Sequence, residues 1–169
     1  VAKKLEDENG LHYDASQIIM TSGAKHAVFN ALAALINPGD EVIIPAPYWV
    51  TYPELVKWLG GTPVFVQAGI EKNFKIDAED LRKACTPRTK AILLNNPCNP
   101  TGKGITRAEA EKLVSSVEAL VILDEAYMDF WTESLLDKIE DYSNLIIFRT
   151  ASKLVGAAAL RLGFAVANP

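Results

Sequence analysis

Seven short runs rich in apolar and β-branched residues recur along the chain, and helical patterns separate most of them. Hydrophobicity inside the runs is continuous rather than alternating, as in Ala-Ile-Leu-Leu at 91–94, which is what a strand covered by helices on both faces requires. The runs are 18–21, 41–45, 63–67, 90–95, 120–124, 145–150 and 162–167. Alternation of strand and helix predicts an α/β protein with a three-layer αβα fold around a mostly parallel seven-stranded sheet.

Helices are clearest at 25–36, 77–84 and 106–117. Thr106 is a candidate N-cap for the last of these, and Glu109 three residues later would complete a capping box. Because we find no internal repeat and no long linker, we expect residues 1–169 to form a single domain.

Composition narrows the classes of partner. The 169 residues, 49% of them hydrophobic, suffice for one domain with a buried core, and the formal net charge of −4 favours neither a nucleic acid nor an anionic membrane as partner. No apolar run is long enough to span a membrane, and the charged start does not resemble a targeting peptide. Cys85 and Cys98 are too few for a disulfide framework and stand in no metal-binding array, so we expect no metal and a reducing, cytoplasmic setting.

In a sheet of this kind ligands gather at the carboxyl ends of the strands, so the residues just after each run are candidates for chemistry. Five such segments carry small, polar or aromatic residues and are expected to line one edge. They are 22–25, 47–49, 96–102, 124–127 and 150–153.

Two features suit an anion. Ser22-Gly23-Ala24 leads into a helix, where backbone N–H groups and the helix dipole favour a phosphate. Arg161 could fold back toward the same edge, and its planar fork also suits a phosphate. Taken alone, small residues open many helices and a lone arginine is more often a surface residue, so the ordinary interpretations stay open.

Asp124 ends a strongly apolar run, where an ionised carboxylate is costly unless it meets a cation. The alternative is a carboxylate that caps or pairs at a strand end, and Glu125 beside it fits an ordinary surface acid. Trp49 follows a proline-rich strand exit and can stack on a planar ring, although a lone tryptophan is more often core. We assign Trp58 and Trp131 to packing for that reason.

Lys153 follows Thr150 and Ser152, whose hydroxyls can hydrogen-bond an anion. A lysine in such a place can attack a carbonyl as a neutral amine. Most lysines are solvated surface charges, and spacing alone does not single this one out.

Together these segments resemble the large domain of fold-type I pyridoxal 5'-phosphate (PLP) enzymes, in the class I/II aminotransferase superfamily. The resemblance runs through nearly the whole chain, and it implies amino-group transfer between an amino acid and a 2-oxo acid. By this resemblance Lys153, Asp124 and Tyr127 are catalytic: Lys153 forms the Schiff base and shuttles a proton, and Asp124 holds the pyridine nitrogen protonated. Asn99 and Tyr127 would donate to the phenolic oxygen, and Trp49 would stack on the ring. The phosphate would be held by Gly23, Ala24, Lys25, Thr150, Ser152 and Arg161.

Different parts of the chain resemble different branches of the superfamily. Segments 45–54 and 95–102 are most similar to aspartate aminotransferases, whereas Leu-Asp-Glu-Ala-Tyr-Met-Asp-Phe at 123–130 is more similar to histidinol-phosphate aminotransferases. Residues 154–159 depart from the family's usual pattern, so the turn that delivers Arg161 is in question. Either the parent lies between these branches, or the chain is a recombined or trimmed product of a longer parent. The missing initial Met and the end at Pro169 favour the second interpretation.

The resemblance further implies that the chain is the PLP-binding large domain alone, without the C-terminal small domain and the N-terminal arm. Transamination would then be slow and unselective, and a homodimer is possible. The alternative is a folded large-domain scaffold without significant catalysis. A dinucleotide-binding dehydrogenase fits less well, because no Gly-x-Gly-x-x-Gly follows the first run.

Overall fold

The computed structural model describes residues 1–153 and 156–168, and it places seven strands in one sheet in the order β1-β7-β6-β5-β4-β2-β3. Neighbouring strands are parallel from β6 through β5, β4 and β2 to β3, whereas β7 runs antiparallel to both β6 and β1. The expected mostly parallel seven-stranded sheet is therefore confirmed. The strands are β1 Thr21–Ser22, β2 Glu41–Ala46, β3 Thr62–Gln67, β4 Thr89–Asn95, β5 Leu120–Asp124, β6 Leu145–Thr150 and β7 Leu162–Ala167.

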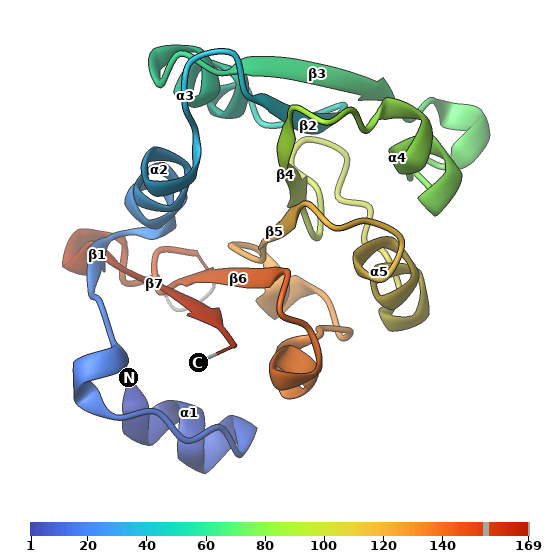
Figure 1. Cartoon of the computed structure of the whole chain (residues 1–169). Helices are drawn as coiled ribbons and strands as arrows, with labels where there is room; N and C mark the ends of the chain where they lie inside the picture. The colour runs from blue at the N-terminus through green and yellow to red at the C-terminus, as the bar shows by residue number, and fades with distance from the viewer. Residues whose placement is uncertain (154–155, 169) are drawn as a thin grey trace.

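Helices cover both faces of the sheet, as Figure 1 shows, with α2 and α3 on one side and α4 and α5 on the other. Each side has its own core: one apolar cluster joins the sheet to α2 and α3, and the other joins it to α1, α4 and α5. The α-helices are α1 Ala2–Asn9, α2 Ala24–Leu35, α3 Thr51–Trp58, α4 Ala78–Ala84 and α5 Arg107–Val114. Short 3-10 helices are η1 Ala15–Gln17, η2 Ile70–Lys72, η3 Met128–Phe130, η4 Leu136–Asp141 and η5 Ala158–Leu160. The three-layer αβα prediction is confirmed.

The predicted start of α5 is confirmed in detail. Thr106 Oγ1 accepts a hydrogen bond from the Glu109 N–H at 3.2 Å, and Glu109 Oε2 accepts one from the Thr106 N–H at 2.7 Å. This reciprocal pair satisfies two N–H groups that a helix start otherwise leaves without partners.

Two expectations about the fold need correction, and a third is confirmed. Strand β1 has only two residues, and Ile19 and Met20 before it are exposed rather than buried in the sheet. Trp58 is 84% exposed at the end of α3, so its assignment to packing is wrong: Val56 in the same turn packs in the core, whereas Trp58 faces solvent. Trp131 does pack, because its ring covers Gly104 and its Nε1–H donates to the Ile105 carbonyl at 3.0 Å.

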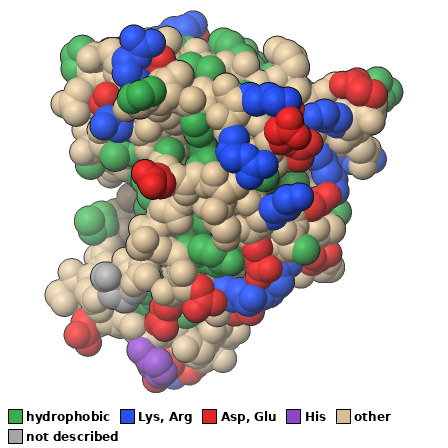
Figure 2. All heavy atoms as spheres, turned by 45° about the vertical axis from the view of Figure 1, so that its right-hand side comes forward, with side chains coloured by type: hydrophobic (Ala, Val, Ile, Leu, Met, Phe, Trp, Pro, Cys, Tyr) green, Lys and Arg blue, Asp and Glu red, His purple; other side chains and the backbone are tan. Residues whose placement is uncertain are grey.

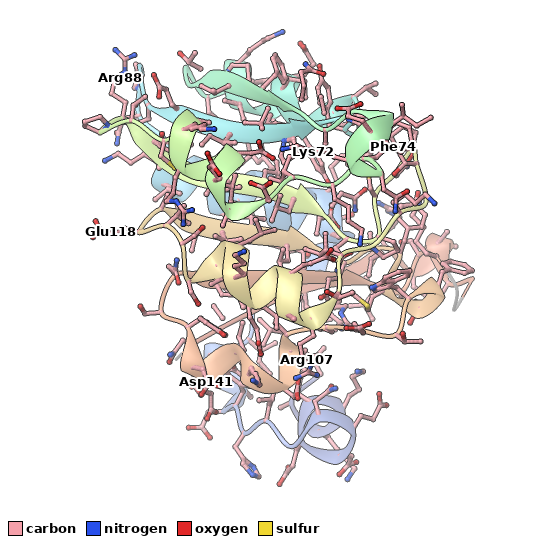
Figure 3. All side chains as sticks on the ribbon, turned by 90° about the vertical axis from the view of Figure 1, so that its right-hand side faces the viewer. Lys72, Phe74, Arg88, Arg107, Glu118 and Asp141 are labelled. Carbon is pink, nitrogen blue, oxygen red and sulfur yellow. The ribbon has the colours of Figure 1, made fainter. Side chains whose placement is uncertain are left out.

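Charges of both signs are interspersed on the outer face that carries α4 and α5 (Figures 2 and 3). Ion pairs account for several of them, such as Arg107 with Asp137 at 2.8 Å and Lys72 with Asp80 at 2.7 Å. In Figure 3 Arg88 and Glu118 mark the edge of the sheet where β4 and β5 begin, and Phe74 lies at the opposite edge, where the parallel strands end. Within the described ranges, no helix combines the length and apolar character needed to cross a membrane.

Gly163 allows the start of α2 to lie directly against β7. A Cβ at this position would be 2.3 Å from the Gly23 carbonyl carbon and 2.4 Å from the Ala24 nitrogen. Both atoms belong to the backbone, so a side chain could be accommodated only if the helix start moved.

We predict that Gly163→Ala lowers the free energy of unfolding by about 1–3 kcal/mol, because the added methyl forces the backbone of α2 away from the sheet. Denaturant unfolding measures the change. Ala165→Ser, at an exposed position on the same strand, is the control and should stay within about 0.5 kcal/mol of wild type. Equal stability of the two variants would show that the close approach is not required.

Candidate functional site

A cavity of about 220 Å³ lies at the edge of the sheet where the parallel strands end. The structure brings all eleven residues singled out from the sequence into its lining, although they come from five different strand ends and from the segment before β7. These residues are Gly23, Ala24, Lys25, Trp49, Asn99, Asp124, Tyr127, Thr150, Ser152, Lys153 and Arg161. Tyr52, Asn95 and Ala126 line it as well.

Strand direction explains why Arg161 reaches this edge. Because β7 is antiparallel to β6, its first residues lie beside the last residues of β6, where Thr150 pairs with Gly163. Arg161 directly precedes β7, and its Nη2 donates to the Ser22 carbonyl at 3.3 Å. Of the preceding segment that departs from the family pattern, residues 154 and 155 lie outside the described residues.

The start of α2 offers backbone donors to the cavity. No side chain caps this helix, and among the described residues no acceptor contacts the N–H groups of Ala24 and Lys25. The Gly23 N–H differs from expectation, since it already donates to the carbonyls of Thr21 and Arg161 at 2.8 and 3.0 Å. Two free N–H groups at the positive end of a helix dipole form a ready anion site.

Three cationic side chains surround the same space. Lys25 Nζ lies 4.5 Å from the centroid of the Trp49 ring, and Lys153 Nζ lies 4.8 Å from that of Tyr127. Within residues 1–153 and 156–168, neither lysine nor Arg161 forms an ion pair. The cavity therefore carries excess positive charge, which an anionic ligand would neutralise.

Among the described residues of the lining, Asp124 is the one carboxylate, and it is 3% exposed. Its Oδ2 accepts a hydrogen bond from the Tyr52 hydroxyl at 2.7 Å, and its Oδ1 accepts one from the Ala126 N–H at 3.0 Å. Burial raises the pKa of Asp124, and the two hydrogen bonds and the charge of Lys153 oppose that rise. No cation of the described chain forms an ion pair with this carboxylate, so the carboxylate is available to pair with a cationic group of a ligand.

Asn99 and Tyr127 converge on one point of the cavity. Asn99 Nδ2 donates to the Tyr127 hydroxyl at 3.1 Å. Asn95 fixes this arrangement, because its Oδ1 accepts from the Asn99 N–H at 2.7 Å and its Nδ2 donates to the Asp124 carbonyl at 2.8 Å. Thr150 and Ser152 also line the cavity: the Ser152 N–H donates to Thr150 Oγ1 at 3.2 Å, and the two hydroxyls are 3.1 Å apart.

The family model of class I and II aminotransferases matches residues 1–169. The chain belongs to this family. Its similarity to aspartate/prephenate aminotransferase from Cereibacter sphaeroides is 42% identity over 98% of this chain and 44% of that protein. Aspartate aminotransferase from Geobacillus stearothermophilus is 47% identical over 75% of this chain and 33% of that protein.

Solved structures of aminotransferases share the fold. Aspartate aminotransferase from Thermus thermophilus with maleate matches with a TM-score of 0.87 and 35% identity, over 99% of this chain and 45% of that chain. An aromatic aminotransferase from Pyrococcus horikoshii matches with a TM-score of 0.89 and 32% identity, over 98% of this chain and 47% of that chain. This chain thus spans less than half the length of these proteins. The similarity of segment 123–130 to histidinol-phosphate aminotransferases stays a prediction.

The sequence interpretation missed Tyr52 and was wrong about Glu125. Tyr52 lies three residues after Trp49, a helical spacing that would have pointed to it had α3 been predicted.

Glu125 is 1% exposed rather than a surface acid: Arg149 Nη2 lies 2.6 Å from its Oε2, and Ser134 Oγ donates to its carboxylate at 2.8 Å. Burial raises the pKa of Glu125 to about 7, against the opposing effects of Arg149 and Ser134.

This raised pKa predicts how stability depends on pH. The folded chain holds the proton of Glu125 more tightly than the unfolded chain does, so this group contributes stability below its ordinary pKa of 4.5 and loses the contribution as pH rises through about 7. We predict that the free energy of unfolding of wild type minus that of Glu125→Gln falls across this window, by at most about 1.4 kcal/mol per pH unit. Urea unfolding at a series of pH values measures it.

Asp137→Asn provides a control of opposite sign. The hydrogen bond from Arg107 lowers the pKa of Asp137, so the wild-type advantage over this variant should shrink as pH falls below the ordinary value of 3.8. A difference for Glu125→Gln that stays flat through the window would contradict the raised pKa.

Proposed function

We propose that this cavity binds PLP and that the chain is the cofactor-binding part of an aminotransferase, which transfers an amino group between an amino acid and a 2-oxo acid. One observation carries the proposal: a single cavity combines a buried carboxylate that has no cationic partner with three cations that have no anionic partner among the described residues. PLP carries both missing charges, as a ring nitrogen that can be protonated and a phosphate. Family membership supports the same ligand class.

The residues around the start of α2 fit the phosphate. The N–H groups of Ala24 and Lys25 are free to donate, and the guanidinium of Arg161 lies beside them against Gly23. Gly23 has φ 80°, a conformation that side chains disfavour, and a Cβ there would approach Arg161 Nη2 to 2.8 Å. The hydroxyls of Thr150 and Ser152 would donate further hydrogen bonds to the phosphate.

The remaining residues fit the ring. Asp124 would pair with the protonated ring nitrogen, and Tyr52 would hold that carboxylate in orientation. The side chains of Asn99 and Tyr127 would donate to the phenolic oxygen. Trp49 is half-buried in the lining and would lie against the ring face.

When bound, PLP supplies a carbonyl that accepts the amino group and a conjugated ring that stores an electron pair. The chain supplies the groups that position and move protons. Lys153 Nζ would act as the amine that holds the cofactor and as the acid and base for the proton on the substrate α-carbon. The negative charge of Asp124 would stabilise the protonated ring nitrogen. Ligand binding would not have to supply the free energy of desolvating this carboxylate, because the carboxylate is already buried in the folded chain.

The extent of catalysis by these 169 residues belongs to the proposal as well. Arg161 is the one arginine of the described residues in the lining, and it is assigned to the phosphate, so no second arginine is available to position a substrate carboxylate. Poor positioning can cost many orders of magnitude in rate. We therefore propose slow, unselective transamination by this chain. A homodimer is a separate part of the proposal.

PLP binding at Lys153 is tested directly. After addition of PLP and dialysis, wild type should keep a visible absorption band, and borohydride should fix the cofactor on the peptide that contains Lys153. Lys153→Ala should lose the band while remaining folded, since the side chain is exposed. Lys112→Ala, an exposed lysine on α5, is the control and should behave as wild type. If the folded wild type retained no band, PLP binding would be contradicted and the chain would be a folded scaffold without the cofactor.

The role of Asp124 is tested by Asp124→Asn, which keeps the shape and removes the charge. Its one carbonyl oxygen can accept from the Ala126 N–H, and its amide can donate to the Tyr52 hydroxyl. We expect the dissociation constant for PLP to rise about tenfold or more, because a buried pairing with the ring nitrogen is lost. Thermal stability without cofactor should be equal or higher, since a buried carboxylate no longer has to be desolvated. An unchanged dissociation constant would place the ring nitrogen elsewhere.

A further inference from the structure

A buried charged cluster lies directly behind the cavity. Glu125 follows Asp124 in sequence, and Arg149 precedes Thr150, so each of two neighbouring strands places a charged residue next to a cavity residue. Arg149 donates to Glu125 Oε2 through Nε at 2.7 Å, and its Nη2 lies 2.6 Å from the same oxygen. None of the cluster contributes to the cavity lining.

The pair joins the two strands beyond their last paired residues. The register of β5 and β6 ends at Asp124 opposite Phe148, and the Glu125 N–H donates to the Phe148 carbonyl at 3.0 Å. Because successive side chains of a strand point to opposite faces, Glu125 and Arg149 lie on the face away from Asp124 and Thr150. The ion pair therefore fixes, from behind, the spacing of the two strand ends that carry Asp124 and Thr150.

Ser134 ties a third segment to this pair. Its hydroxyl contacts Glu125 Oε1 and Oε2 at 2.8 and 2.9 Å, and Arg149 Nη2 donates to Ser134 Oγ at 3.1 Å. Ser134 follows η3, the segment that begins right after Tyr127. The cluster thus connects the backbone around three of the segments that line the cavity: the end of β5, the Tyr127 turn and the end of β6.

Stability alone does not account for this arrangement. Removing two charges from water is costly, and apolar residues of similar volume in place of a buried ion pair are often as stable or more so. A directional pair with a shared serine does fix geometry, because each hydrogen bond tolerates little displacement.

We propose that Glu125, Arg149 and Ser134 are positioning residues, which hold the ends of β5 and β6 so that Asp124 and the segment from Thr150 to Lys153 face the cofactor together. This inference rests on the proposed binding of PLP. None of the three touches the ligand; they act through the residues next to them.

The decisive variant is the double replacement Glu125→Leu with Arg149→Met, which substitutes an apolar pair for the ion pair. Thermal unfolding without cofactor and titration with PLP are both measured at about pH 8, above the raised pKa of Glu125. We expect the melting temperature to match or exceed that of wild type, whereas the dissociation constant for PLP rises about tenfold because its binding groups are displaced. A purely structural pair would give wild-type affinity once stability is restored.

Two further variants keep the test decisive. Glu125→Gln retains an acceptor for Ser134 and is the variant to use if the double replacement does not fold; its dissociation constant should rise at least about threefold. Arg107→Gln with Asp137→Asn removes an exposed ion pair away from the cavity and should leave the affinity unchanged. Wild-type affinity in a folded Glu125 variant overturns this inference alone, whereas a wild-type chain that binds no PLP overturns the proposed function together with it.

Discussion

Strand direction is the constraint on which the candidate site depends. The parallel strands β2, β4, β5 and β6 end at one edge of the sheet, so residues distant in sequence meet there without any long loop. Antiparallel β7 completes the arrangement in two ways: its beginning brings Arg161 to that edge, and its pairing with β1 brings the start of α2 there. The anion-binding part of the cavity therefore depends on the one strand that breaks the parallel pattern.

Among the residues that the structure describes, the charges that line the cavity do not balance one another. Lys25, Lys153 and Arg161 gather near the free N–H groups of α2, and the buried Asp124 is satisfied by hydrogen bonds from Tyr52 and Ala126. Folding bears the cost of desolvating that carboxylate before any ligand arrives. A site of this kind is preorganised for a ligand with a negative group and a positive group, because no charged side chain has to be moved to admit it.

Most of the sheet and the cavity could be predicted because both follow from local pattern. Continuous apolar runs define the strands, and each cavity residue stands within a few positions of a strand end. The failures concern features that depend on what lies nearby in space. Trp58 is as apolar as a core residue, yet its side chain is exposed while Val56 of the same helical turn is buried. Tyr52 lies in a helix whose first turn contains Pro53, which obscures the helical pattern. Nothing local predicts that Tyr52 meets Asp124, 72 positions later.

Asp124 and Glu125 show the limit most sharply. They are adjacent, both carboxylates and both buried, yet alternation along the strand sends them to opposite faces. One meets a tyrosine and an open cavity, and the other meets Arg149, 24 positions away on the next strand. Sequence assigns the same side-chain chemistry to both, and only the register of β5 against β6 decides which carboxylate has a cation inside the protein. The one without such a partner is the one left available to a ligand.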